Sequence, residues 1–135
     1  MGTRSNTIIY DDDVQILNLY RQHDGYLSGH GIELLEFLEP MTIVNGFSIG
    51  EPNQANGAGC LAAQMVAHFK VGVGGFYIVP LQEEDDYAHD YTYTIKVGRQ
   101  LGGGNISITV HAYGLDQIFE GSIESFKEFI AEEVK

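Results

Sequence analysis

The sequence predicts an α+β domain over residues 1–135, with a mostly antiparallel sheet of five or six strands and about three helices. Two long segments, residues 91–97 and 106–112, alternate between apolar and polar side chains, as strands with one buried face do. Three other segments repeat apolar residues at helical spacing. Because no linker, repeat or low-complexity stretch divides the chain, we expect one domain, with at least two helices on the apolar face of its sheet.

The N-terminal segment predicts a β-hairpin. Residues 6–10 form a short β-prone run, three aspartates at positions 11–13 make a polar turn, and residues 14–20 resume the β-prone pattern. In the second strand, alternate residues face opposite sides of the sheet, with Leu17 and Leu19 on one side.

The middle of the chain predicts two helices and two short strands. Residues 32–38 carry an apolar stripe with glutamates outside it, and Pro40 ends this helix. Residues 60–69 follow a helical period in which small alanines allow close approach to a sheet. Short apolar runs over residues 41–49 and 76–79 indicate strands.

The C-terminal part predicts a long hairpin, a short strand and a closing helix. A glycine-bearing stretch joins the two alternating strands, a short strand follows around residues 117–120, and Ser122 caps the last helix. The polar face of the hairpin is expected to meet solvent, or to meet a second copy of the chain and form a homo-oligomer, because short side chains let another sheet approach. This face carries Thr92, Thr94, Ser107, Thr109 and His111.

The charge balance excludes a nucleic-acid binder. The chain has 7 basic and 19 acidic residues and a formal net charge of −12, a field that repels a phosphate backbone. Solubility is the simplest explanation of this charge. The alternative is an acidic face that imitates nucleic acid and inhibits a basic host protein, with acidic runs at residues 11–13 and 83–86.

The sequence predicts neither a membrane partner nor a cofactor. No apolar run approaches the roughly 20 residues needed to cross a bilayer, and no secretory signal is recognised. The single cysteine, Cys60, excludes an intrachain disulfide framework and suits a reducing compartment. We therefore expect a cytoplasmic protein.

The most informative stretch is the polar loop over residues 21–31, between a predicted strand and a predicted helix. Its side chains form hydrogen bonds readily, and its three glycines let the backbone approach a neighbour. Residues 56–59 lead into the next helix in a similar way. Helix starts expose unpaired N–H groups and bind anions, although glycines also precede helices that bind nothing, and neither segment matches a Walker A or GxGxxG pattern. The candidate ligand-binding residues are Arg21, His23, Asp24, Tyr26, Ser28, His30, Gly31, Asn56, Gly57 and Gly59.

Arg21 is the first candidate for binding a negative charge. It ends a strand that should be half-buried, and its guanidinium can bind a phosphate or carboxylate through two nitrogens. Its alternative role is an ion pair with Asp24 or with a glutamate of the following helix. Arg4 is a second candidate. Tyr20 and Tyr26 flank the loop, where they would stack on a ligand ring or pack over the edge of the core.

Catalytic and metal-binding interpretations rest on His23, Asp24 and His30. A histidine oriented by a carboxylate acts as a general base, and these three side chains are possible metal ligands. No nucleophile motif accompanies them, and the spacing of His23 and His30 is not a zinc pattern. We therefore predict no catalytic residue and no metal, and interpret the other histidines as structural: His68, His89 and, on the exposed face of a strand, His111.

Four segments resemble a family of short, largely uncharacterised proteins of phages and bacteria. They read MGTRS at residues 1–5, YRQHDGYLSGHG at 20–31, GAGCLAAQMVAHF at 57–69 and IFEG at 118–121. The resemblance implies a phage-linked accessory protein in the host cytoplasm, for which interference with host defence is a natural role. It implies no catalytic residue.

Together these observations predict a non-enzymatic protein that sequesters a small anionic, nucleotide-derived ligand such as a host signalling molecule. Arg21 would bind the charge, the two helix starts would donate N–H groups, and Tyr20 or Tyr26 would stack on a base. Two alternatives remain: an acidic inhibitor of a basic host protein, and a small hydrolase that uses His23 and Asp24.

Overall fold

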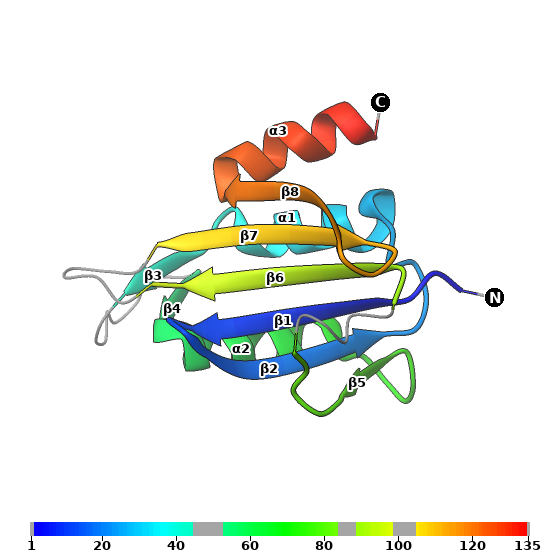
Figure 1. The fold of residues 1–135 in the computed structure, drawn as a ribbon. Coiled ribbons are helices and arrows are strands. Elements are labelled where there is room, and N and C mark those ends of the chain that lie inside the picture. The colour runs from blue at the N-terminus through cyan, green and yellow to red at the C-terminus, as the bar shows by residue number, and fades with distance from the viewer. Residues whose placement is uncertain (1, 45–52, 84–88, 99–104, 135) are drawn as a thin grey trace.

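The computed structural model describes residues 2–44, 53–83, 89–98 and 105–134 (Figure 1). Within them, six strands form one sheet in the order β5-β2-β1-β6-β7-β8. These strands are β1 (Ser5–Asp11), β2 (Val14–Arg21), β5 (Phe76–Ile78), β6 (Tyr91–Val97), β7 (Ile106–Ala112) and β8 (Asp116–Ser122). A separate parallel pair consists of β3 (Thr42–Val44) and β4 (Gln54–Asn56). The helices are α1 (Ile32–Leu38), α2 (Gly57–Phe69) and α3 (Ile123–Glu133), with one π-helical turn, η1 (Leu27–Gly31), directly before α1.

The sheet joins two antiparallel units through one parallel contact. β1 and β2 form the predicted hairpin, β6 to β8 form a meander, and β1 runs parallel to β6. Ile9 of β1 lies opposite both Leu17 and Ile95, and Ile95 lies opposite Ile108. One apolar row therefore crosses four strands on a single face, which fixes the register of the sheet.

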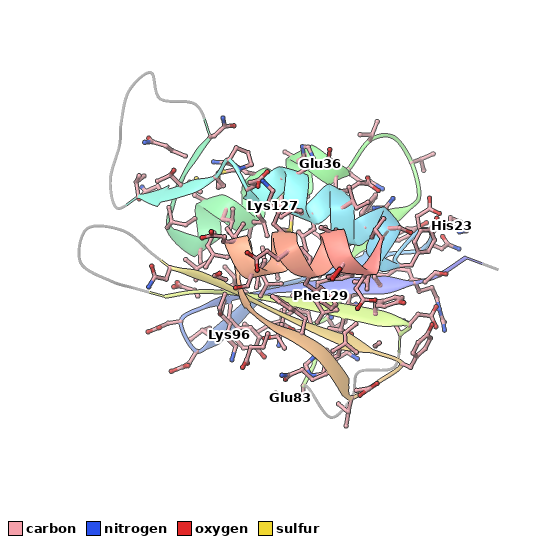
Figure 2. The ribbon with its side chains drawn as sticks, turned by 90° about the horizontal axis from the view of Figure 1, so that it is seen from above. His23, Glu36, Glu83, Lys96, Lys127 and Phe129 are labelled. Atoms are coloured by element: carbon pink, nitrogen blue, oxygen red, sulfur yellow. The ribbon has the colours of Figure 1, made fainter. Side chains whose placement is uncertain are left out.

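The helices α1, α2 and α3 cover this apolar face (Figures 1 and 2). In Figure 2, Glu36 of α1 lies on the helical side of the sheet, and Lys96 lies on the other. Burial of each large apolar side chain stabilises the fold by roughly 1.5–3 kcal/mol, so this layer holds the molecule together. Its fully buried members include Ile9, Leu34, Leu38, Leu61, Met65, Tyr93, Ile95, Ile108, Val110 and Phe126.

A segment of the chain crosses the opposite face of the sheet. After β5, residues 79–83 pass over β2 and β1, in front of the sheet in Figure 1. The N–H of Val79 donates to the carbonyl of Asn18 (3.0 Å), and Asn18 Nδ2 donates to the carbonyl of Pro80 (2.9 Å). Gln15 Nε2 further donates to the carbonyl of Gln82 (2.8 Å). Polar side chains of β2 therefore hold this segment against the sheet.

The polar face of the long hairpin is largely buried. Thr92, Thr94 and His111 are at most 5% exposed, so the prediction that they lie on a solvent-exposed surface is wrong. Alternation shows that two faces of a strand differ in polarity, but it does not show whether another segment covers the polar one. Ser107 on the same face is exposed and Thr109 is half-buried, so only part of the predicted polar surface is open.

Several local boundaries differ from those predicted. α1 has the predicted range, whereas α2 begins at Gly57, three residues early, because the small residues there are compatible with a helical turn. Ser122 caps α3 as predicted, its Oγ accepting the N–H of Ser125 (3.1 Å). β3 covers the start of the strand expected over residues 41–49; residues 45–49 and the acidic residues 84–86 lie outside the described residues.

Candidate functional site

The predicted ligand loop, residues 21–31, folds closely onto the start of β1. The N–H of Gly25 donates to the carbonyl of Thr3 (2.9 Å). A Cβ added at Gly25 would lie 2.7 Å from Ser5 Cβ, so a side chain here would clash. The close approach that this glycine permits is therefore made by the protein's own N-terminal segment.

α1 begins after Gly31 as predicted, but it does not have the free N-terminus that the anion-binding hypothesis requires. The turn η1 continues directly into α1, and the N–H of Ile32 is bonded to carbonyls of Leu27 and Gly29. His30 and Gly31 are both buried. Backbone amides at this point are satisfied within a continuous helical segment, so they do not form the exposed N-terminus that an anion needs.

His30 lies at the centre of a closed polar network beneath α1. Its ring is fully buried between Phe69 and Tyr93, with ring centroids 5.2 and 5.0 Å away. Arg21 Nη1 can only donate and lies 3.1 Å from His30 Nδ1, so Nδ1 accepts and the N–H at Nε2 donates to Thr7 Oγ1 (2.6 Å). Burial, with a smaller contribution from the charge of Arg21, lowers the pKa of His30 to about 3. The ring is therefore neutral at pH 7.

Arg21 is occupied by the same network. Its Nη2 pairs with Glu33 of α1 (2.9 Å), and its Nε donates to the carbonyl of His23 (2.7 Å). The guanidinium also lies over the ring of Phe76, 5.0 Å from the centroid. All three guanidinium nitrogens contact protein atoms, and the partner is a helical glutamate, the alternative to ligand binding that the sequence left open.

The other loop residues lie at the surface without forming a catalytic pair. The hydroxyl of Tyr26 donates to Asp24 Oδ1 (3.0 Å), and this bond raises the pKa of Tyr26. His23 and Ser28 are exposed. Among the described residues, no hydrogen bond joins the His23 ring to Asp24, and no three His, Cys, Asp or Glu side chains are grouped to hold a metal ion. The hydrolase hypothesis therefore gains no support from this geometry.

The second glycine segment lies at the opposite end of the sheet. Phe69, the last residue of α2, contacts His30, whereas Gly57 is the first residue of this 13-residue helix. At 1.5 Å per residue, the two ends of α2 are about 18 Å apart. Figure 1 shows the start of α2 beside β4, far from η1. Asn56 and Gly59 are exposed there, and the two predicted segments do not form one site.

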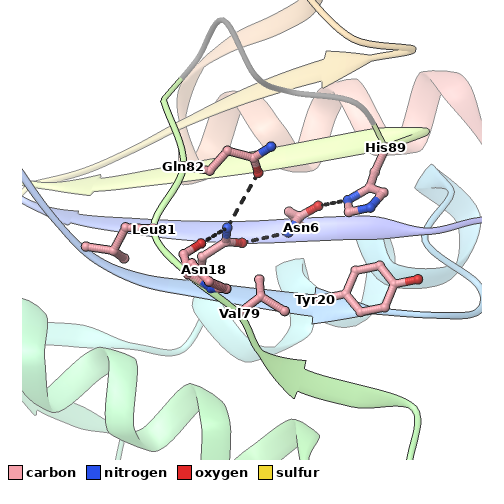
Figure 3. A pocket seen from close by; sticks show the side chains of 8 residues that line it. Asn6, Asn18, Tyr20, Val79, Leu81, Gln82 and His89 are labelled. Carbon is pink, nitrogen blue, oxygen red and sulfur yellow. Dashed lines mark hydrogen bonds between the residues drawn. The ribbon is translucent and has the colours of Figure 1, made fainter.

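A pocket on the face opposite the helices unites residues that the sequence analysis did not connect. β1 and β2 form its floor, and the segment that follows β5 forms one wall (Figure 3). Its volume is about 420 Å³, within the range of small-molecule sites. The lining residues are Asn6, Asn18, Tyr20, Val79, Pro80, Leu81, Gln82 and His89.

Hydrogen bonds run in series along the pocket floor. His89 Nδ1 is bonded to Asn6 Oδ1, Asn6 Nδ2 donates to Asn18 Oδ1 (2.7 Å), and Asn18 Nδ2 donates to the carbonyl of Pro80 (2.9 Å). Since Asn6 Oδ1 can only accept, His89 carries its proton on Nδ1 and has a lone pair on Nε2. Asn6 and Asn18 are 2% and 1% exposed, so these bonds fix the orientation of both amides.

His89 is the one basic side chain among the described lining residues of this pocket. Its ring lies 4.9 Å from the ring of Tyr20. Burial and the nearby charge of Arg4 lower the pKa of His89, and Asp90 opposes them in part. Nε2 has no hydrogen bond to another described residue, and a neutral imidazole nitrogen of this kind accepts a hydrogen bond from a ligand or removes a proton from it.

The pocket suits binding better than nucleophilic chemistry. Its described lining combines an aromatic ring, apolar side chains and three carboxamides, but it contains no serine, threonine or cysteine. The sequence carried one signal for it: Asn6 and Asn18 sit within strands, where asparagine is disfavoured unless its amide has a specific partner. His89, for which the sequence predicts a structural role, contributes the one basic group among the described lining residues.

Comparison of the chain with protein-family models, with curated proteins and with solved structures found no match. The resemblance to phage and bacterial proteins therefore stays a prediction from the sequence. Across the described ranges, no helix has the length and apolar character required to span a membrane.

Proposed function

We propose that this protein binds a small nucleotide-derived ligand in the pocket around Asn6, Asn18, Tyr20 and His89, and holds it without changing it. The observation that carries the proposal is a pair of almost fully buried carboxamides beneath a part-buried imidazole and a tyrosine ring. A few fixed polar groups among apolar walls are typical of sites that select small molecules.

The lining residues can bind both the polar edge and the ring face of a nucleobase. Asn6 Nδ2 gives one of its two hydrogens to Asn18 Oδ1, which has a second lone pair, so a donor and an acceptor lie 2.7 Å apart. Such a pair complements adjacent C=O and N–H groups on the edge of a base. Tyr20 offers a ring for stacking, and Val79 and Leu81 offer apolar contact.

Sequestration is favoured over catalysis by the composition of the same pocket. His89 is the one basic group among its described lining residues, and no acidic or nucleophilic side chain accompanies it there. A protein that only removes a signalling nucleotide from solution needs complementary binding groups and no proton-transfer machinery. The resemblance to phage proteins favours such a role in a host cell.

Calorimetric titration with nucleobases, nucleosides and cyclic or linear nucleotides tests the proposal. His89→Ala should weaken binding roughly tenfold, because the ligand loses one hydrogen bond. His23→Ala, in the loop that the sequence favoured, should leave affinity unchanged, and chromatography should recover the ligand intact. The proposal is refuted if folded protein shows neither heat nor a thermal shift with any of these compounds.

A second candidate function is inhibition of a basic protein. A groove of about 700 Å³ between the end of α1 and α3 is lined by Glu39, Glu124 and Glu128, with Lys127 paired to Glu39 (2.7 Å). Capture of a basic partner through this groove should weaken steeply with salt and with Glu124→Gln. Capture that is equally strong in high salt would contradict it.

A further inference from the structure

We infer that the pocket takes a mononucleotide, with its single phosphate at Arg4 and its base towards Leu81. This inference rests on the proposed function and names the ligand class of the same site.

Arg4 lies at the His89 end of the pocket. The N–H of Tyr91 donates to the carbonyl of Arg4 (3.2 Å), so the pairing of β1 with β6 extends back to this residue. Alternate residues of a strand share a face, which puts Arg4 on the same face as Asn6, roughly 7 Å away along the strand. The charge of Arg4 also lowers the pKa of His89, in agreement with a guanidinium on the His89 side of the pocket.

Arg4 has the freedom that Arg21 lacks. Arg4 is exposed, and no ion pair joins its guanidinium to another described residue. Asp90 Oδ2 accepts the backbone N–H of Arg4 (3.1 Å), which holds the main chain in place beside the pocket. A phosphate at this end would therefore meet a fixed backbone and a guanidinium able to donate two parallel hydrogen bonds.

The two ends of the pocket differ in chemistry. Figure 3 shows Leu81 and His89 at opposite ends, with Asn6 and Asn18 between them. Leu81 is 55% exposed, so its side chain is an apolar contact surface at the end away from Arg4. A nucleotide would follow this order of residues if its base lay over Leu81 and the carboxamides and its phosphate lay beyond His89.

Charge and volume restrict the ligand to one phosphate. The chain has a formal net charge of −12, and the described lining of the pocket contains no lysine or arginine. Each phosphate beyond the first would add negative charge without a second cation to bind it. The volume of about 420 Å³ lies towards the small end of ligand sites, which favours one nucleotide over a dinucleotide.

The test compares nucleosides, their 5′- and cyclic monophosphates and their triphosphates by calorimetry on the full chain. At least one monophosphate should bind about tenfold more tightly than its nucleoside, which is the effect of one charge-assisted contact to phosphate. Arg4→Gln should reduce that affinity to the level of the nucleoside. Lys96→Gln removes the same charge from the same face of the sheet, away from the pocket, and should change nothing.

The possible failures are distinguishable. If nucleosides and monophosphates bind equally and Arg4→Gln has no effect, this inference is overturned and the proposed function stands. Tighter binding of triphosphates than of monophosphates overturns the restriction to one phosphate. If folded protein binds none of the compounds, the inference and the proposed function fall together. Equal losses in Arg4→Gln and Lys96→Gln would show a general charge effect and would also overturn the assignment of Arg4.

Discussion

Two neighbouring residues of β1 each hold a histidine, on opposite faces of the sheet. Thr7 bonds to His30 beneath α1, and Asn6 bonds to His89 in the pocket. Burial lowers the pKa of both rings. The difference lies in access: His30 is fully buried with both nitrogens bonded, whereas His89 is part-buried and has one bonded nitrogen among the described contacts. A histidine surrounded by polar side chains is therefore available to a ligand only when one nitrogen remains accessible.

The comparison predicts opposite consequences for the two histidines. His30→Ala should destabilise the protein by about 3 kcal/mol, because it leaves a cavity between Phe69 and Tyr93 and removes the partner of Thr7 and of one Arg21 nitrogen. His89→Ala should cost less stability and mainly reduce affinity. Urea unfolding of both variants measures this, and a larger loss of stability in His89→Ala would reverse the assignment of the two rings.

Acid should weaken the fold through His30. A histidine of the unfolded chain takes up a proton below about pH 6.5, whereas His30 in the folded chain resists protonation down to a pKa of about 3. Its contribution is therefore fully present above pH 6.5 and is lost as pH falls, by about 2 kcal/mol at pH 5.

His30→Gln should remove most of this slope between pH 7 and pH 5 in urea unfolding curves. Some slope should remain, since the pKa of His89 is lowered as well. The control variant is His23→Gln, which makes the same substitution at an exposed histidine outside the buried bonds of His30. An unchanged slope in His30→Gln would show that the buried ring is not the source.

Asn18 tests whether the pocket floor also supports the segment over residues 79–83. Asn18→Ala removes the donor to the carbonyl of Pro80 and the acceptor for Asn6 Nδ2, and should cost about 1–2 kcal/mol. Hydrogen exchange should increase at Gln82, whose N–H is bonded to Gln15. Protection at Gln82 equal to that of the wild type would mean that the Asn18 side chain does not hold this segment, and that Gln15 and the backbone bond of Val79 suffice.

Gly59→Ala should have the smallest effect and the opposite sign. A Cβ at Gly59 meets no atom within 4 Å, and alanine favours helix over glycine, so the variant should gain roughly 0.5–1 kcal/mol. If an anion approached this helix start, as the sequence first indicated, the added methyl group would weaken binding. Unchanged affinity together with a higher melting temperature is the expected result.

Periodicity predicted most of the helices and strands, because the side-chain pattern of each element depends only on residues close together in the sequence. The range of α1, the β6–β7 hairpin and the cap at Ser122 follow from spacing along the chain. The parallel contact between β1 and β6 did not follow, because periodicity within a strand does not identify its partner. The same limit explains why a polar face that another part of the chain buries was expected to meet solvent.

The site was missed for a related reason. Residues 21–31 looked like a ligand site because their hydrogen-bonding groups had no visible partners in sequence, yet Arg21 and His30 find partners in Glu33 and Thr7. The sequence did not predict the pocket, because its lining residues are spread over β1, β2 and the segment after β5. The one indication of the pocket in the sequence was the presence of two asparagines, Asn6 and Asn18, within strands.

The bond between Asn6 and His89 also bears on how the protein folds, because it joins residues 83 positions apart. Contacts of such long range form slowly, after the entropy of closing the intervening chain has been overcome. On a ribosome, β1 and β2 emerge before His89, so the proposed pocket cannot form until residues 79–89 have also emerged. If the proposal holds, a nucleotide should bind only after that point, and bound ligand should slow unfolding of the whole sheet.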